Sequence, residues 1–95
     1  MIPHYDEIVT KARSLCKAKN DDYASDDDPF SNFKLAEYAG LSSTEEAILA
    51  RILDKTSRVI QVLKTGNTVK DESLEDTALD LINYWIILLA YRKNK

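Results

Sequence analysis

The chain has 95 residues, which suits one domain spanning residues 1–95 with a modest core, since a chain of this length buries only about 60–65% of its unfolded surface. Hydrophobic residues make up 44% and charged residues 31%, as in soluble globular domains, and the presence of only two Gly and two Pro disfavours a turn-rich β fold. The net charge of −3 argues against nonspecific binding to duplex nucleic acid, which requires a basic face.

The first long helix is predicted between Pro3 and Lys19. Proline suits the first helical position, and the apolar residues after it recur at the spacing of one buried stripe. These residues are Tyr5, Ile8, Val9, Ala12, Leu15 and Cys16. Cys16 is the single cysteine, and on this stripe we interpret it as an inert core thiol. Without a disulfide framework, a cysteine- and histidine-rich zinc site or a secretory leader, the chain is expected to be cytoplasmic.

An acidic segment from Asn20 to Pro29 is predicted to be a solvated loop, because its five aspartates cannot pack into a core. The Asp-x-Asp-x-Asp-Gly pattern of a calcium loop is absent. A short helix is expected from Ser31 to Ala39, ended by Gly40. Around this segment, cationic, amide and aromatic side chains could hold a base and phosphates, although no glycine-rich phosphate loop is present. They are Lys17, Lys19, Asn20, Asp21, Tyr23, Asn32 and Phe33.

The second long helix is predicted to start at the capping box formed by Ser43 and Glu46 and to end at Gly66. One broad face is apolar, and the other carries a polar stripe of Arg51, Asp54, Arg58 and Gln61. Two interpretations of this stripe stay open. It is either the solvated side of an amphipathic helix, or it places Asp54 opposite the last helix with Arg51, Lys55 or Arg58 available to phosphate.

The third long helix is predicted from the cap Ser73 to about Arg92. It is apolar on nearly every side, and such a helix is normally buried. Its most apolar stretch, Leu79 to Tyr91, contains Asp80 and Asn83 and is too short to cross a bilayer, so no membrane association is expected.

Helical geometry aligns Asp76, Asp80 and Asn83 on one side of this last helix. Two carboxylates one turn apart repel each other unless a cation lies between them. Hard oxygen ligands suit Mg²⁺ or Mn²⁺, which bind one or two carboxylates together with substrate phosphates. We therefore predict a magnesium site on this stripe, with Asn83 supporting the metal or a water molecule. The alternative is that Asp76 serves only the helix start and that Asp80 pairs with Arg or Lys.

Several runs resemble the MazG-like, all-α nucleoside triphosphate pyrophosphohydrolases, and in particular their short phage branch, the nucleotide modification associated domain. The strongest run extends from Glu75 to Tyr84, and the similarity covers the chain from about Lys17 onwards. The other runs are Asp54-Lys55-Thr56-Ser57-Arg58, Lys19-Asn20-Asp21-Asp22-Tyr23 and Phe30-Ser31-Asn32-Phe33.

The resemblance implies Mg²⁺-dependent hydrolysis of (deoxy)nucleoside triphosphates to monophosphate and pyrophosphate, in the host cytoplasm if a phage encodes the chain. It implies catalytic and metal-binding roles for Asp54, Asp76 and Asp80. Phosphate partners are expected to be Lys17, Lys19, Lys55 and Arg58, and base contacts Asn20, Tyr23, Asn32 and Phe33. The chain departs from the family pattern, because Thr77 and Arg51 stand where the family has acidic residues.

The sequence therefore predicts an all-α bundle of three long helices and a short one, completed by self-association into a homodimer or homotetramer. Self-association is expected because the second and third long helices carry more apolar surface than a monomer can cover. Two alternatives to the enzyme stay open. One is a noncatalytic helical module that binds a nucleotide or a protein, and the other is a purely structural oligomerisation domain.

Overall fold

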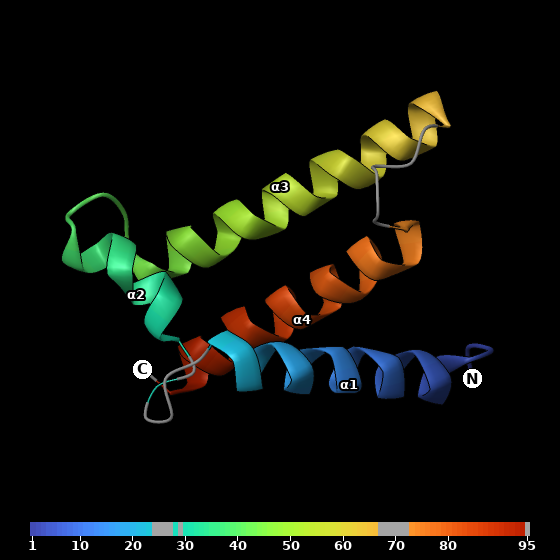
Figure 1. Cartoon of the computed structure of the whole chain (residues 1–95), viewed down its shortest axis with the longest axis horizontal. Helices are drawn as coiled ribbons and strands as arrows, with labels where there is room; N and C mark the ends of the chain where they lie inside the picture. The colour runs from blue at the N-terminus through green and yellow to red at the C-terminus, as the bar shows by residue number, and fades with distance from the viewer. Residues whose placement is uncertain (24–27, 29, 67–72, 95) are drawn as a thin grey trace.

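A computed structural model describes residues 1–23, 28, 30–66 and 73–94 of the chain, with residues 20–23 described by their backbone alone. These residues form four α-helices: α1 (Tyr5–Tyr23), α2 (Ser31–Tyr38), α3 (Thr44–Thr65) and α4 (Leu74–Lys93) (Figure 1). The predicted all-helical class, with three long helices and one short helix, is confirmed.

The predicted starts of α3 and α4 are confirmed by their caps. The Ser43 hydroxyl accepts a hydrogen bond from the backbone N–H of Glu46 at 3.1 Å, and the Glu46 carboxylate accepts one from the backbone N–H of Ser43 at 3.0 Å. The Ser73 hydroxyl likewise accepts from the backbone N–H of Asp76 at 3.0 Å. At the end of α3, Gly66 has a φ of 73°, a left-handed conformation that glycine adopts without a steric penalty. Local sequence thus fixes these boundaries.

Both predicted ends of α1 are wrong by one turn or less. The helix starts at Tyr5 rather than Pro3, because His4 lies between them with a φ of 63°, outside the helical region. It continues past Lys19 to Tyr23, so the first four residues of the predicted acidic loop are helical. No Gly or Pro occurs between Pro3 and Pro29 to end the helix earlier. Asp26 and Asp27, which were also placed in that loop, lie outside the described residues.

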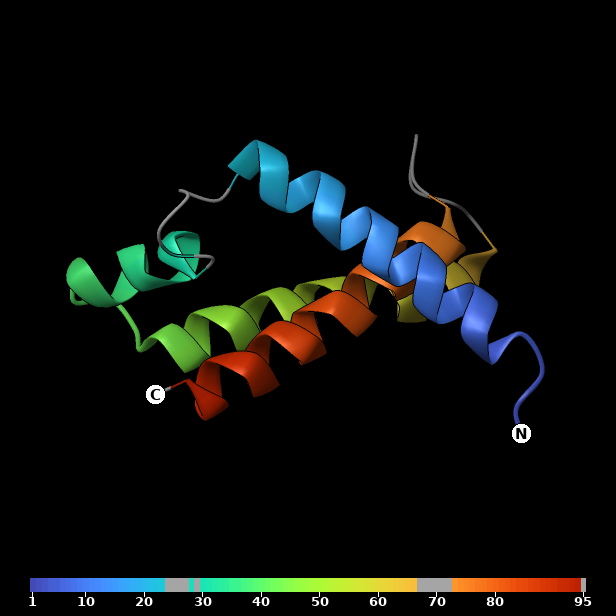
Figure 2. The same ribbon diagram turned by 90° about the horizontal axis from the view of Figure 1, so that it is seen from below.

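The helices form two layers. Helices α3 and α4 run antiparallel side by side, and α1 packs on α4 from one side of this pair, as Figures 1 and 2 show. The short helix α2 packs on α3 near its start. An ion pair between Lys34 and Asp28, 2.6 Å from Nζ to Oδ2, ties the start of α2, and the Phe30 ring meets the Tyr91 ring of α4 edge to face at 5.5 Å.

The core of the described chain is small, with only five buried hydrophobic residues: Ala12, Phe30, Ile48, Ile52 and Leu79. Helix α4 buries its polar residues Thr77, Asp80 and Asn83, while large apolar side chains on its other side remain exposed. We call the exposed apolar surface of the helix pair the α3–α4 face, and define it by Leu49, Leu53, Ile60, Ile82, Trp85 and Leu89. The expectation that α4 is buried all round is therefore not met within a single chain.

Candidate functional site

Asp80 lies in the middle of α4, and its side chain is only 8% exposed. The preceding residues Thr77 and Leu79 are also buried, so this stretch of α4 faces the other helices. A buried carboxylate without a partner is costly, and Asp80 has two cationic partners. Oδ1 accepts from Nζ of Lys19 at 2.6 Å, and Oδ2 lies 3.2 Å from Nζ of Lys55.

The two lysines come from different helices and differ in exposure. Lys19 is on the last turns of α1 with its side chain 47% exposed, whereas Lys55 is in the middle of α3 with its side chain 16% exposed. Asp80 thus joins three helices through charge-assisted contacts. Lys55 is therefore packed between the helices, whereas the Lys19 side chain is accessible to solvent.

A pocket of about 700 Å³ opens beside this cluster, within the range typical of small-molecule sites, roughly 300–1,000 Å³. All four helices contribute to it. Its polar and aromatic lining consists of Cys16, Lys19, Asn32, Phe33, Ser42, Arg51, Asp80, Asn83 and Tyr84, and the apolar remainder comprises Ala36, Leu41, Ala47, Ala50 and Ile87. Cys16, which we expected in the core, is half-buried at the pocket wall.

Two aromatic rings in contact with each other line the pocket. The rings of Phe33 on α2 and Tyr84 on α4 meet edge to face, with 6.2 Å between centroids and 86° between planes. Asn32, the neighbour of Phe33, is exposed and lines the same pocket. The sequence-predicted residues Asn32 and Phe33 are therefore brought to Lys19 and Asp80, although half the chain separates them from Asp80.

Asn83 links α4 to α1 through a buried hydrogen bond. Its side-chain amide donates a hydrogen bond to the backbone carbonyl of Ala12 at 2.9 Å, and both residues are buried. This contact fastens α1 to α4. Asn83 also lines the pocket through the rest of its side chain, so its predicted role beside the ligand is combined with a role in helix packing.

Asp54 and Asp76 do not converge on Asp80. The Asp54 side chain is 59% exposed and lies 3.8 Å from the Arg58 guanidinium on the same helix. Asp76 is exposed in the first turn of α4, one helical turn before Asp80 in the sequence. It lines a separate, shallower depression with Thr10, Lys11 and Glu75. The predicted set of three carboxylates is therefore spread over three environments.

The remaining predicted residues lie elsewhere. Lys17 is exposed on α1, and neither Lys17 nor Arg58 lines the pocket. The side chains of Asn20 and Tyr23 lie outside the part of the chain that the structure describes. Of the predicted binding residues, the structure therefore gathers Lys19, Lys55, Asn32, Phe33 and Asn83 around or beside Asp80.

The described donor set does not fit a resident divalent ion. Magnesium prefers carboxylate oxygens and water in an octahedral shell, but both oxygens of Asp80 face ammonium groups, and Asp54 and Asp76 point elsewhere. Among the residues that the structure describes, no three His, Cys, Asp or Glu side chains are grouped to hold a metal ion. The charge partner of Asp80 in this arrangement is lysine.

Residue-by-residue reasoning missed Tyr84 as a pocket residue, and it named Arg51 only in the alternative that placed the polar stripe opposite the last helix. Helical spacing offered the signal, because residues four apart lie on one side of a helix. Arg51 precedes Lys55 by one turn on α3, and Tyr84 follows Asp80 by one turn on α4. The sequence left open whether these two sides face each other.

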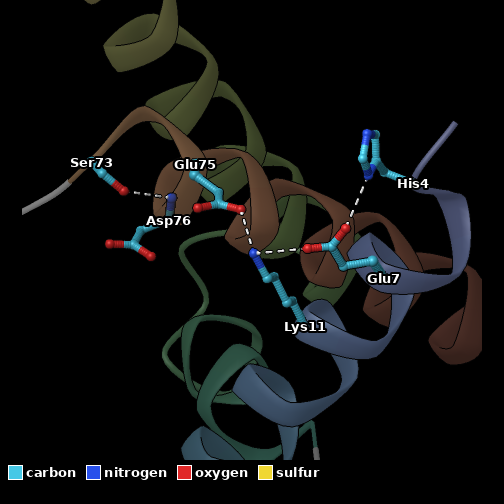
Figure 3. A network of polar contacts seen from close by, with 6 residues as sticks. All are labelled: His4, Glu7, Lys11, Ser73, Glu75 and Asp76. Carbon is cyan, nitrogen blue, oxygen red and sulfur yellow. Dashed lines mark hydrogen bonds and ion pairs between the residues drawn. The ribbon is translucent and has the colours of Figure 1, made fainter.

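A second polar network lies at the other end of α1, away from the pocket, and is drawn in Figure 3. Nζ of Lys11 lies 3.2 Å from the Glu75 carboxylate of α4 and 3.7 Å from that of Glu7, which also contacts His4 at 3.1 Å. The hydrogen bond that Lys11 donates to Glu75 and the negative charge of Glu75 both raise the pKa of Lys11. All of these side chains are about half exposed or more, so this network joins α1 to α4 at the surface.

Comparison of the chain with protein families, curated proteins and solved structures finds no match. None of the described helices has the length and apolar character needed to span a bilayer. Inference about function therefore starts from the pocket itself.

Proposed function

We propose that the chain binds a nucleotide in the pocket beside Asp80. The observation that carries this proposal is that cationic groups and aromatic rings line one and the same pocket. A nucleotide has the complementary parts, since its phosphates carry negative charge and its base presents flat apolar faces. The family resemblance described above supports the same ligand class.

Lys19 and Arg51 are the cationic residues of the pocket lining. They come from α1 and α3, respectively. Lysine offers a point charge and arginine a planar fork of donors, and both groups bind phosphate oxygens. The half-exposed Lys19 ammonium is accessible to a ligand entering from solvent.

Phe33 and Tyr84 are the aromatic residues of the pocket lining, and their rings are in contact. Stacking of a base on an aromatic ring contributes about 1–3 kcal/mol in single-stranded nucleic acid complexes and tolerates every base. The Asn32 amide next to Phe33 supplies both a donor and an acceptor for the edge of a base. Together these groups supply the contacts that base recognition needs.

Calorimetric titration with the four deoxynucleoside mono- and triphosphates, in the presence of a chelator, tests the proposal. Replacing Lys19 with methionine should weaken binding by about 10- to 100-fold, as expected for losing a hydrogen bond to a charged group. Lys11→Met is the matched control, because Lys11 lies on the same helix and pairs with a carboxylate of α4 outside the pocket. If the wild-type protein binds no nucleotide in this panel, the proposal is wrong.

Mg²⁺-dependent hydrolysis of nucleoside triphosphates to monophosphate and pyrophosphate is the second candidate function. It is favoured by the burial of Asp80 at the pocket wall, within the run that resembles the pyrophosphohydrolases. It requires Mg²⁺ to enter together with the triphosphate, because the described residues do not fit a resident ion. Incubation with each nucleoside triphosphate and Mg²⁺, followed by phosphorus NMR of the products, tests it. In this case Asp80→Asn should abolish pyrophosphate release and leave the helical circular dichroism unchanged.

We also propose that the functional form is a homo-oligomer assembled through the α3–α4 face. The accessible surface is 7262 Å², whereas a compact monomer of 10.8 kDa is expected to expose about 5,500 Å². The radius of gyration is 14.6 Å against an expected value of about 12 Å.

The excess surface, roughly 1,700 Å², exceeds the approximately 800 Å² that each partner buries in a standard interface. Large apolar side chains on α3 and α4 account for part of it. The occupant best suited to these two adjacent amphipathic helices is the same pair from a second copy, since such helices pack into bundles.

A further inference from the structure

We propose that Asp80 is an internal counter-ion of the pocket: it holds Lys19 when no ligand is bound and loses Lys19 to the phosphate of a bound nucleotide. This inference rests on the proposed nucleotide binding and assigns to Asp80 a role opposite to that of a ligand-binding group. Asp80 is thus a positioning residue for the lysines, and its charge lowers the affinity for anions.

The first argument is that only one of the two ammonium groups is exchangeable. Lys55 is 16% exposed and sits in the middle of α3, so its contact with Asp80 belongs to the packing of α3 on α4. Lys19 is 47% exposed, lies near the end of α1 and lines the pocket. Its flexible four-carbon side chain allows the ammonium group to turn toward a ligand while the backbone stays in place.

The second argument is that the Asp80 carboxylate cannot move together with the Lys19 ammonium group. It is 8% exposed and lies between the buried residues Leu79 and Asn83 in α4, and Asn83 is fastened to α1. Nζ of Lys19 already donates a hydrogen bond to Oδ1 of Asp80 at 2.6 Å. A phosphate that binds Lys19 therefore competes with a fixed carboxylate for the same ammonium group. It also experiences repulsion from that carboxylate, because like charges a few ångströms apart are poorly screened when one of them is buried.

The direction in which one substitution changes the affinity for nucleotides distinguishes this role of Asp80 from its alternatives. Asp80→Asn keeps the size of the side chain but removes the competing charge. A nearby unit charge in a partly buried site changes affinity by at least on the order of tenfold, so the variant should bind deoxynucleoside monophosphates about tenfold more tightly in the presence of a chelator. A residue that contacts the ligand directly, or that serves only the fold, would give weaker or unchanged binding.

Glu75→Gln is the matched control. Glu75 is also on α4 and pairs with Lys11 of α1 at 3.2 Å (Figure 3). It does not line the pocket beside Asp80. The affinity of the Glu75→Gln variant for the same monophosphates should stay within twofold of that of wild type.

Calorimetric titrations of the three proteins give distinguishable outcomes. Tighter binding by Asp80→Asn than by wild type, with Glu75→Gln unchanged, supports the inference. Binding by wild type with equal or weaker binding by Asp80→Asn overturns the inference and leaves the proposed function standing. If wild type binds none of the mono- and triphosphates, both are overturned.

A measurement on the wild-type protein keeps the inference testable if Asp80→Asn does not fold. NMR of the side-chain ammonium groups in ¹⁵N-labelled protein follows Lys19 directly. Adding the tightest-binding monophosphate should shift the Lys19 signal and leave that of Lys11, which pairs with Glu75, in place. A Lys19 signal unaffected by saturating nucleotide would overturn the inference.

Discussion

Replacing Trp85 with alanine removes the largest side chain from the α3–α4 face. Trp85 is 48% exposed in a single chain. It lies two residues, or about 200° of helical turn, beyond Asn83, which faces α1. Trp85 therefore points away from α1, to the side of the α3–α4 pair on which a second copy is proposed to pack.

The size of the effect follows from the exposed area. A large aromatic side chain has about 150–250 Å² of surface, so burying the exposed half removes roughly 100 Å² from water in each copy. At about 25 cal/mol per Å², this contributes about 2.5 kcal/mol per copy, or about 5 kcal/mol for a symmetric pair. Because 1.4 kcal/mol corresponds to a factor of ten, the dissociation constant of the dimer should rise by up to about 4,000-fold. Relaxation of neighbouring side chains reduces this figure, and we expect an increase of at least about tenfold.

Sedimentation velocity over a wide range of protein concentration measures this shift directly. Tyr38→Ala is the matched control, since Tyr38 is an aromatic residue that is 81% exposed but lies on α2, away from the face. The reasoning is refuted if wild type sediments as a strict monomer at every concentration, or if Trp85→Ala and wild type dissociate with the same constant.

Three further predictions concern stability. Asn83→Ala should lower the free energy of unfolding by about 1–3 kcal/mol in urea, because the buried carbonyl of Ala12 loses a donor. The hydrogen bonds that the Asp28 carboxylate accepts from Lys34 and from the backbone N–H of Phe30 lower the pKa of Asp28. The carboxylate therefore stabilises the fold above the ordinary aspartate pKa, and this stabilisation is lost as the pH falls through the lowered value. Thermal unfolding across the acid range should show this loss in wild type and a smaller one in Asp28→Asn. Removal of the α3 cap in Ser43→Ala should cost about 0.5–2 kcal/mol in the same urea assay, and an unchanged midpoint would contradict the capping role.

Local patterns predicted most of the secondary structure. Capping depends on side chains within three or four residues of the helix end, so Ser43, Ser73 and Gly66 marked their boundaries correctly. The errors at α1 arose where such signals were weak: a histidine took a left-handed conformation before the helix, and aspartates alone did not end it.

The candidate site was predicted in part. The sequence singled out Asp80 because a carboxylate within an apolar helix requires a partner, and the structure gives it two. Pairing with Lys or Arg was the alternative to the metal site, and in this arrangement lysines are the partners. Periodicity could not decide between them, because it orders residues around one helix and carries no information about which helix lies opposite.

The sequence alone therefore determined four helices, their caps and the one side of α4 that carries polar groups, since all of these depend on neighbours along the chain. Only the tertiary structure decided that Lys19 and Lys55 meet at Asp80, that Asn32 and Phe33 share a pocket with Arg51, and that Asp54 and Asp76 lie apart. The two contacts of Asp80 join residues 61 and 25 positions apart. They are fixed by how α1 and α3 pack against α4, where the cost of burying a charge selects which side chains come together.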